Sequence, residues 1–340
     1  MKRFLTTIAA FIFIPVLLLV AVYIITDPYR TIRPFSLEDF DETNRDYVSS
    51  ELWLMNNPVQ HYDSYLFGSS RLGGINTYHW LKYLPEGSSH FLFQGWGETI
   101  TGMEQKISYI NGAGLPIKNA ILLLDYPGAF RKDQNLITVT SIKHPTFAGR
   151  PKLIHESILF WFFLQKPSQW WRAVIQWKNP RKPEFDFDPI SNDTNRNNKY
   201  SDLDTPPGKD SLKKCSETNR ESFIMENSCK TDSDLRIGNA MINEVFEGQL
   251  RHIRSIFDAQ GTDYRIILSP DYCYTNLKLN EADLKKLRDI FGEDNVFDFT
   301  GRNYMTEDYN NYSDPEHFGL WVGWHMIEEI YNQEQHKSQY

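Results

Sequence analysis

The chain has 340 residues, of which 41% are hydrophobic and 14% aromatic, and this composition excludes a disordered protein or a collagen. Its net charge is −8, with 36 Lys and Arg against 44 Asp and Glu, so it lacks the basic excess that grips a nucleic-acid backbone. The 3 cysteines form no Cys-x-x-Cys pair, and we expect neither a disulfide scaffold nor structural zinc. We therefore expect no nucleic-acid partner, no metal and no cofactor.

The N-terminus carries a long apolar segment. Residues 4–25 contain no charge, and at about 1.5 Å per residue a helix of this length crosses a hydrocarbon layer of about 30 Å. The alternative is a cleaved signal peptide, but its apolar region would be only about 7–15 residues and would end in small residues. This segment instead ends Tyr-Ile-Ile-Thr-Asp-Pro, so we predict an uncleaved single-pass anchor over 1–26. Two basic residues precede it and two follow it, so the positive-inside rule does not orient it: Lys2, Arg3, Arg30 and Arg33.

A polar tether is expected over 27–61, followed by a soluble domain over 62–335. Short apolar runs begin there, each ended by Gly, Pro, Asp or Ser, as is typical of strands buried on both faces. The runs are Ser64–Gly68, His90–Gln94, Asn119–Asp125, Tyr264–Ser269 and Asn295–Phe299.

Helical patterns alternate with these runs. Apolar residues recur at three- and four-residue spacing in Asn239–Gln260, Glu281–Phe291 and from Gly319 to about Gln333. Strands that alternate with helices imply a parallel sheet covered on both sides. We predict an α/β fold with a doubly wound parallel sheet, a three-layer flavodoxin-like arrangement.

The segment 130–236 interrupts this alternation. It opens with an aromatic amphipathic stretch, Lys152–Trp177, and continues with a polar loop, Asn179–Asp234. Two interpretations stay open: a helical insertion packed on the sheet with a mobile loop, or a lid or membrane-facing element, since Trp favours the boundary between apolar and wet surroundings. Cys215 and Cys229 could pair if the domain is extracytoplasmic.

Two short motifs carry residues suited to catalysis. Ser70 follows the first predicted strand at a Gly-marked turn, which places its hydroxyl at the carboxyl edge of the sheet, where ligands of open α/β sheets bind. A serine hydroxyl needs an imidazole to take its proton and a carboxylate to orient the imidazole, and Asp314 and His317 satisfy this on one turn before the last helix. Taken alone, the first motif also fits an ordinary helix cap and the second a solvated turn.

The order and placement of these motifs resemble the SGNH (GDSL-like) hydrolase family. The resemblance implies Ser70 as nucleophile, His317 as general base and Asp314 as the orienting acid. It also implies an oxyanion hole made by the Ser70 amide and by either Gly95 or Gly97. In the third motif the family has an asparagine that this chain lacks, because the corresponding strand ends Leu124-Asp125-Tyr126. One lost oxyanion donor costs about 10²–10³ in rate.

A single N-terminal anchor before these motifs resembles the membrane-anchored bacterial branch of that superfamily, whose members help to esterify teichoic acids with D-alanine or O-acetylate exopolysaccharides. This resemblance implies a soluble domain outside the cytoplasmic membrane, an envelope glycan or polymer as substrate, and a multi-span acyltransferase as partner.

Other polar residues follow the predicted strands. Arg71 either binds a substrate phosphate or carboxylate or pairs with a neighbouring acid, Asp125 either faces the cleft or caps a helix, and Asp271 could line the same pocket. The sequence thus predicts a membrane-anchored serine esterase or O-acyltransferase. The alternative is a non-catalytic envelope protein that binds glycan or a membrane acyltransferase.

Overall fold

The computed structural model describes residues 1–33, 45–131, 143–164, 166–178, 187–193, 205–207, 236–272, 277–314 and 316–337. The chain forms two compact units. The first comprises Met1–Glu51 and Asp133–Glu184, and the second comprises Leu52–Lys132 and Phe185–Tyr340. Most of the polar loop, with the pairing expected of Cys215 and Cys229, lies outside the described residues.

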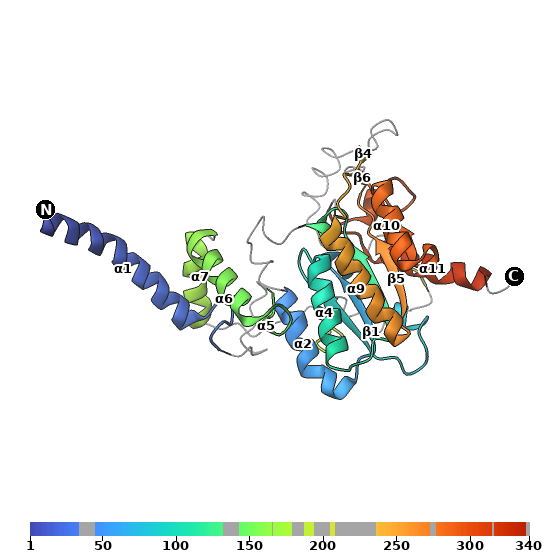
Figure 1. Cartoon of the computed structure of the whole chain (residues 1–340), viewed down its shortest axis with the longest axis horizontal. Helices are drawn as coiled ribbons and strands as arrows, with labels where there is room; N and C mark the ends of the chain where they lie inside the picture. The colour runs from blue at the N-terminus through green and yellow to red at the C-terminus, as the bar shows by residue number, and fades with distance from the viewer. Residues whose placement is uncertain are drawn as a thin grey trace. The chain divides into compact units, whose positions relative to one another are not determined.

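The second unit is built on a five-stranded parallel sheet (Figure 1), which confirms the α/β class. The strand order is β2-β1-β3-β5-β7. The strands are β1 (Ser64–Gly68), β2 (His90–Gln94), β3 (Asn119–Leu124), β5 (Asp263–Leu268) and β7 (Val296–Asp298). Each neighbouring pair runs parallel, so all carboxyl ends lie at one edge.

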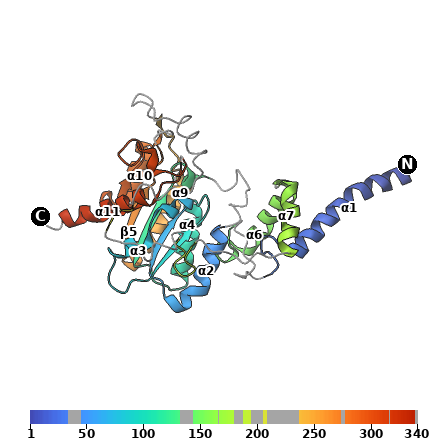
Figure 2. The ribbon, with the colours of Figure 1, turned by 180° about the vertical axis from the view of Figure 1, so that it is seen from behind.

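Helices pack on both faces of this sheet. They are α3 (Thr77–Leu81), α4 (Ile100–Gly112), α9 (Glu244–Gln260), α10 (Glu281–Phe291) and α11 (Leu320–Lys337), with short helical turns η2 (Ser70–Gly74), η3 (Gly128–Phe130), η9 (Glu293–Asn295) and η10 (Tyr309–Asn311). Figure 1 shows α4 and α9 side by side, and Figure 2, seen from behind, shows α3, which contacts α11.

Successive side chains of each strand point to opposite faces of the sheet, because the strands are pleated. Leu66, Ile121 and Ile267 join a buried cluster with Trp80 of α3 and Ile327 of α11. The other face also carries aromatic side chains. The rings of Phe67 and Phe93 stack with centroids 5.5 Å apart, and Tyr264 stacks on Phe257 of α9 at 5.2 Å.

Capping explains where α9 begins. The periodicity predicts a helix from residue 239, but the backbone N–H groups of Met241 and Ile242 donate to the buried carboxylate of Asp283. Asn243 then caps the helix by accepting from two backbone N–H groups, so α9 starts at Glu244. Gly261 ends it at φ 66°, a left-handed conformation that glycine adopts without strain.

Part of the expected polar loop covers the edge of the sheet. The N–H of Leu92 in β2 donates to Ser191 O at 3.0 Å, and Asn192 Nδ2 donates to Leu92 O at 2.6 Å. Asp193 accepts from the backbone N–H of Thr77 at 2.9 Å. The edge strand β2 is thereby paired rather than left open. A further two-stranded pair joins β4 (Arg236–Ile237) to β6 (Leu277–Lys278).

The first unit contains the N-terminal helix α1 (Lys2–Thr26) and the helices α5 (Pro145–Ala148), α6 (Arg150–Leu159) and α7 (Pro167–Lys178). A π-helical turn, Phe160–Leu164, joins α6 to α7. Within α1, Thr6–Thr26 is long and apolar enough to cross a membrane, and no second helix of that kind occurs in the described residues.

Helix α2 (Arg45–Gln60) occupies part of the stretch expected to be a tether. The boundary between the two units falls inside it, after Glu51. In the second unit its residue Trp53 is buried and lies 5.6 Å from the ring of Phe93 in β2. Burial of this apolar side chain explains why the segment is helical there rather than an extended polar linker.

Candidate active site

The turn after β1 presents one serine and buries the other. At Gly68 a Cβ atom would lie 2.9 Å from Leu72 Cγ, so only glycine lets the chain turn directly into η2. Ser69 caps this turn by accepting from the N–H of Arg71 at 3.2 Å, and it is only 2% exposed. Ser70 is half-buried, so its hydroxyl is the accessible one of the two.

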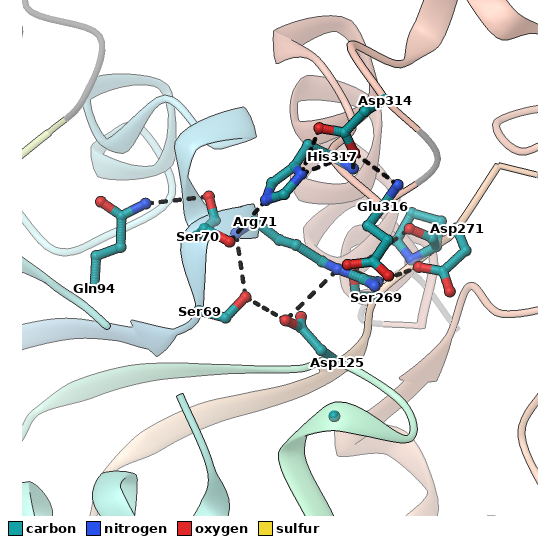
Figure 3. A network of polar contacts seen from close by, with 12 residues as sticks. Ser69, Ser70, Arg71, Gln94, Asp125, Ser269, Asp271, Asp314, Glu316 and His317 are labelled. Carbon is teal, nitrogen blue, oxygen red and sulfur yellow. Dashed lines mark hydrogen bonds and ion pairs between the residues drawn. The ribbon is translucent and has the colours of Figure 1, made fainter. Parts of the chain in front are cut away.

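Ser70, His317 and Asp314 form a continuous hydrogen-bonded chain (Figure 3). Ser70 Oγ lies 2.7 Å from His317 Nε2, although 247 positions separate the two residues. On the other side of the ring, His317 Nδ1 lies 2.9 Å from Asp314 Oδ1 and 2.8 Å from Oδ2. A carboxylate only accepts, so Nδ1 carries the proton and Nε2 is free to accept from the serine.

The loop that carries the acid and the imidazole is held by its own backbone. Asp314 Oδ1 accepts from the N–H of Glu316 at 2.9 Å and from the N–H of His317 at 3.0 Å. The N–H of Ser313 donates to His317 O at 2.9 Å. These bonds fix Asp314 relative to His317.

The two groups shift each other's pKa. The hydrogen bond from Asp314 raises the pKa of His317 above its usual value, and partial burial opposes this. For Asp314, partial burial tends to raise the pKa, but hydrogen bonds from the His317 ring and from the backbone outweigh it and lower the pKa. Asp314 is therefore ionised at neutral pH, and His317 is a stronger base than a free imidazole.

Two glycines bring this loop over the serine. A Cβ atom on Gly323 of α11 would overlap the carbonyl of Gly74 in η2, and a Cβ atom on Gly74 would overlap the ring of Phe318. The backbones of η2 and α11 therefore touch directly. Because His317 lies just before α11 and Ser70 begins η2, this contact sets the distance between them.

A buried ionic network lies beneath the serine. Arg71 is 6% exposed; its Nη1 donates to Ser269 Oγ at 3.0 Å and forms an ion pair with Asp271, and its Nε lies 3.5 Å from Asp125 Oδ2. Ser69 Oγ donates to the same oxygen of Asp125. Of the two roles expected for Arg71, the structure gives pairing with neighbouring acids.

Burial dominates the titration of both acids in this network. It raises the pKa of Asp271 to about 6, with Arg71 opposing the rise and Asp125 adding to it. Burial likewise raises the pKa of Asp125, again opposed by Arg71. For Arg71, burial disfavours the charge, but the two carboxylates outweigh this and raise its pKa. The network joins residues that follow β1, β3 and β5 at one edge of the sheet.

The candidate oxyanion donors differ in what they already bind. The N–H of Gly95 donates to Gly68 O at 3.1 Å. The N–H groups of Ser70 and Gly97, in contrast, donate to no acceptor among the residues that the structure describes. Gly97 has φ 60°, which favours glycine. Gln94 Nε2 donates to Ser70 O at 3.1 Å, linking the end of β2 to the serine turn.

A buried ion pair follows Gly97. Glu98 and Lys106 are both nearly inaccessible and bind each other, and Glu98 Oε1 also accepts from the N–H of Thr99 at 3.0 Å. At Gly102 a Cβ atom would overlap Glu98 Oε1, so this glycine makes room for the carboxylate. The pair anchors the loop after β2 to α4.

No protein-family model matches the chain, and no curated protein matches it. In the described part of the chain, no group of three or more His, Cys, Asp or Glu could hold a metal ion. What these residues can do must be inferred from their own chemistry.

The sequence predicted most of the residues of this site, but not all of their contacts. Asp125 and Arg71 were expected near the cleft because they follow strands. The partners of Arg71 were not assigned, since Ser269 and Asp271 follow β5, almost 200 positions later in the chain. The sequence contained one indication that Arg71, Ser269 and Asp271 lie at the same edge of the sheet, which is that each of them ends or follows a predicted parallel strand.

Proposed function

We propose that this chain is a serine acyl-transfer enzyme, an esterase or an O-acyltransferase, with an SGNH-type doubly wound fold. The observation that carries the proposal is the unbroken contact from Ser70 through His317 to Asp314. A hydroxyl, an imidazole and a carboxylate in this order are the groups that activate a serine nucleophile. The half-buried position of Ser70 leaves its hydroxyl open to substrate.

In the acylation step, Ser70 Oγ attacks the ester carbonyl carbon and passes its proton to His317 Nε2. Asp314 stabilises the imidazolium that forms and keeps the ring oriented. The tetrahedral intermediate then expels the alcohol, which takes the proton from Nε2. An acyl ester on Ser70 remains.

Deacylation reverses these roles. His317 removes a proton from an incoming hydroxyl, whose oxygen attacks the acyl carbon and releases Ser70 with its proton restored. Water as the acceptor gives an esterase, and a sugar or polyol hydroxyl gives an O-acyltransferase. We propose an envelope glycan or polymer as the acceptor or substrate, following the family resemblance.

For the oxyanion we propose the backbone N–H groups of Ser70 and Gly97. Gly95 is the weaker candidate because its N–H already donates to Gly68 O at 3.1 Å. Asp125 occupies the place of the asparagine expected in this family, and a carboxylate supplies no third donor when it is ionised. We therefore expect a slower enzyme than a family member with all donors, by about 10²–10³.

We further propose that α1 anchors the chain in the cytoplasmic membrane of a bacterium, with the second unit outside. The length and apolar character of Thr6–Thr26 support the anchor. A multi-span membrane acyltransferase is the partner that the resemblance suggests as acyl donor.

One observation favours a second candidate, a non-catalytic envelope protein that binds glycan or a membrane acyltransferase. Asp125 is a buried acid at the edge where an oxyanion would form. If it is ionised, it would repel developing negative charge there instead of stabilising it.

Ester hydrolysis tests the proposal. The full chain in detergent micelles is expected to hydrolyse p-nitrophenyl acetate, and Ser70→Ala is expected to abolish this activity. Ser69→Ala is the matched control, because it removes the neighbouring hydroxyl that bonds to Asp125 and is expected to retain activity. Equal activity of the wild type and Ser70→Ala would refute the role of Ser70. Loss of activity only in Ser69→Ala would assign the nucleophile to the other serine.

A further inference from the structure

The helices α6 and α7, with the π-helical turn between them, form a hairpin that exposes large apolar side chains. We define its apolar face by Ile154, Ile158, Phe163, Leu164, Trp171 and Ile175. Phe163 is 76% exposed and Trp171 is 68% exposed. Ile154 and Ile158 share one face of α6, and Trp171 and Ile175 share one face of α7, because each pair is four residues apart. Exposed apolar side chains that share a helix face mark a surface that binds something apolar.

Inside the same unit, the hairpin packs on the last turns of α1. The ring of Trp161 lies 5.5 Å from that of Tyr23, and its Nε1 donates to Leu19 O at 3.2 Å. Trp170 Nε1 in turn donates to Trp161 O at 2.9 Å, which ties α7 to the π-helical turn. Residues 10–18 of α1 are all exposed, whereas Tyr23 is buried.

These contacts determine how deep the hairpin lies in a membrane that α1 crosses. The apolar stretch Thr6–Thr26 has 21 residues. At about 1.5 Å per residue it matches a hydrocarbon layer of about 30 Å. Leu19 then lies about 10 Å inside the Thr26 end. Because Trp161 reaches the carbonyl of Leu19, the turn that carries Phe163 and Leu164 lies at hydrocarbon depth, beside the exposed surface of α1.

The charge of the hairpin suits a lipid surface. Residues 150–178, which span the hairpin, contain five Lys or Arg and one Glu, in a chain whose net charge is −8. Long basic side chains next to an apolar face extend toward anionic headgroups while their stems stay in apolar surroundings. A helix with aromatic and aliphatic residues on one face and basic residues elsewhere is typical of elements that lie in the membrane interface.

We propose that the α6–α7 hairpin is a membrane-embedded element whose apolar face inserts among lipid acyl chains beside α1, with its basic residues at anionic headgroups. This inference rests on α1 spanning a bilayer and does not depend on the acyl chemistry of Ser70. The occupant of the face is lipid, since Trp161 ties the hairpin to Leu19 of α1, whose apolar stretch Thr6–Thr26 is long enough to cross a membrane.

Site-directed fluorescence tests the proposal in the full chain, with its three cysteines replaced by serine. A single cysteine carrying an environment-sensitive NBD label is introduced at Phe163 or at Trp171, and the protein is reconstituted in phosphatidylcholine–phosphatidylglycerol bilayers. Gln169 on α7 is the matched water-facing control, because it is exposed and lies about 160° from Trp171 around the helix at about 100° per residue. Phe13 of α1 is the reference for acyl-chain depth.

Labels at Phe163 and Trp171 are expected to show blue-shifted emission and to be quenched by lipids with brominated acyl chains, as strongly as the label at Phe13. The label at the exposed Gln169 is expected to emit as in water. If Phe13 is quenched but Phe163 and Trp171 are not, insertion of the hairpin is refuted while α1 is still a membrane anchor. If no label is quenched, both the insertion of the hairpin and the anchor role of α1 are refuted. A blue shift that is unchanged when phosphatidylglycerol is omitted overturns the part assigned to anionic headgroups.

Discussion

Asp314→Asn is expected to lower activity strongly and to move its pH dependence. In the protein, Asp314 Oδ1 accepts from two backbone N–H groups, at 2.9 and 3.0 Å, while Oδ2 lies 2.8 Å from His317 Nδ1. The amide oxygen of asparagine is the atom suited to those two N–H groups. Its NH₂ group then faces Nδ1 and donates to it, which forces the proton onto Nε2 and leaves the ring unable to accept from Ser70.

The wrong tautomer of a triad histidine lowers kcat by about 10⁴ when the acid is buried. Here the Asp314 side chain is 50% exposed, and water competes for its hydrogen bonds, so we expect a loss of about 10²–10⁴. Glu316→Gln is the control. It removes an exposed neighbouring acid that bonds to Asp314 through its backbone N–H and whose charge contributes least to the raised pKa of His317, so it is expected to change the rate little.

The pH profile gives a second readout. His317 accepts a proton from Ser70 only when it is neutral, so kcat/KM for p-nitrophenyl acetate rises with pH through the raised pKa of His317. In Asp314→Asn the raising hydrogen bond to a carboxylate is gone, and the acid limb of the remaining activity moves to lower pH. An acid limb that stays in place, or a loss in rate below about tenfold, would refute the orienting role of Asp314.

Three further changes test the surroundings of the site. Ser69→Ala removes a helix cap and is expected to cost about 0.5–2 kcal/mol of stability, measured by denaturant unfolding, since the cap hydroxyl binds a backbone N–H. Burial raises the pKa of Asp271 from 3.8 to about 6, so the folded state binds its proton more tightly. Stability therefore falls by roughly 3 kcal/mol as pH rises from about 4 to about 6. Asp271→Asn is expected to flatten this part of a curve of Tm against pH. An unchanged slope would contradict the burial of an acid beside Arg71. Lys106→Met removes the counter-charge that Lys106 gives to the buried Glu98 carboxylate and is expected to cost about 3–5 kcal/mol in thermal unfolding. Adding Glu98→Gln is expected to recover part of the loss, and no difference between the single and double variants would contradict the pairing.

The sequence predicted the sheet closely because its strands are buried on both faces and read as short apolar runs. The bounds of β1 and β2 are those expected, and β5 and β7 differ by a residue at their ends. The helix Glu281–Phe291 is also confirmed at both ends. These elements share a strong local pattern and clear end signals, such as Asn280, which caps α10.

Long-range polar pairing could not be predicted in the same way. Arg71 was expected to bind either a substrate or an acid, and the sequence did not decide between these roles. The decision comes from Ser269 and Asp271, which the sheet order brings beside Arg71. The contact of Gly74 with Gly323 had no sequence signal either, because it depends on how closely η2 and α11 approach.

The tether and the insertion are two segments whose structure the sequence predicted only in part. A polar stretch before the first strand was expected to be a linker, yet residues 45–60 form α2 because Trp53 is buried against β2. In the insertion, the Trp-rich stretch was expected to be helical, and the structure divides it into α6, a π-helical turn and α7. Its packing on α1 follows from Trp161, whose partner Leu19 lies 142 positions earlier.

Covalent capture of the nucleophile tests the central claim most directly. A fluorophosphonate probe phosphonylates only a serine whose hydroxyl is activated by a neighbouring base. Incubation of the folded full chain with this probe, followed by peptide mass spectrometry, is expected to find the adduct on Ser70 and to find none in His317→Ala. An adduct on Ser69, or labelling that persists without His317, would contradict the account. So would an unlabelled Ser70 in protein whose unfolding transition is intact.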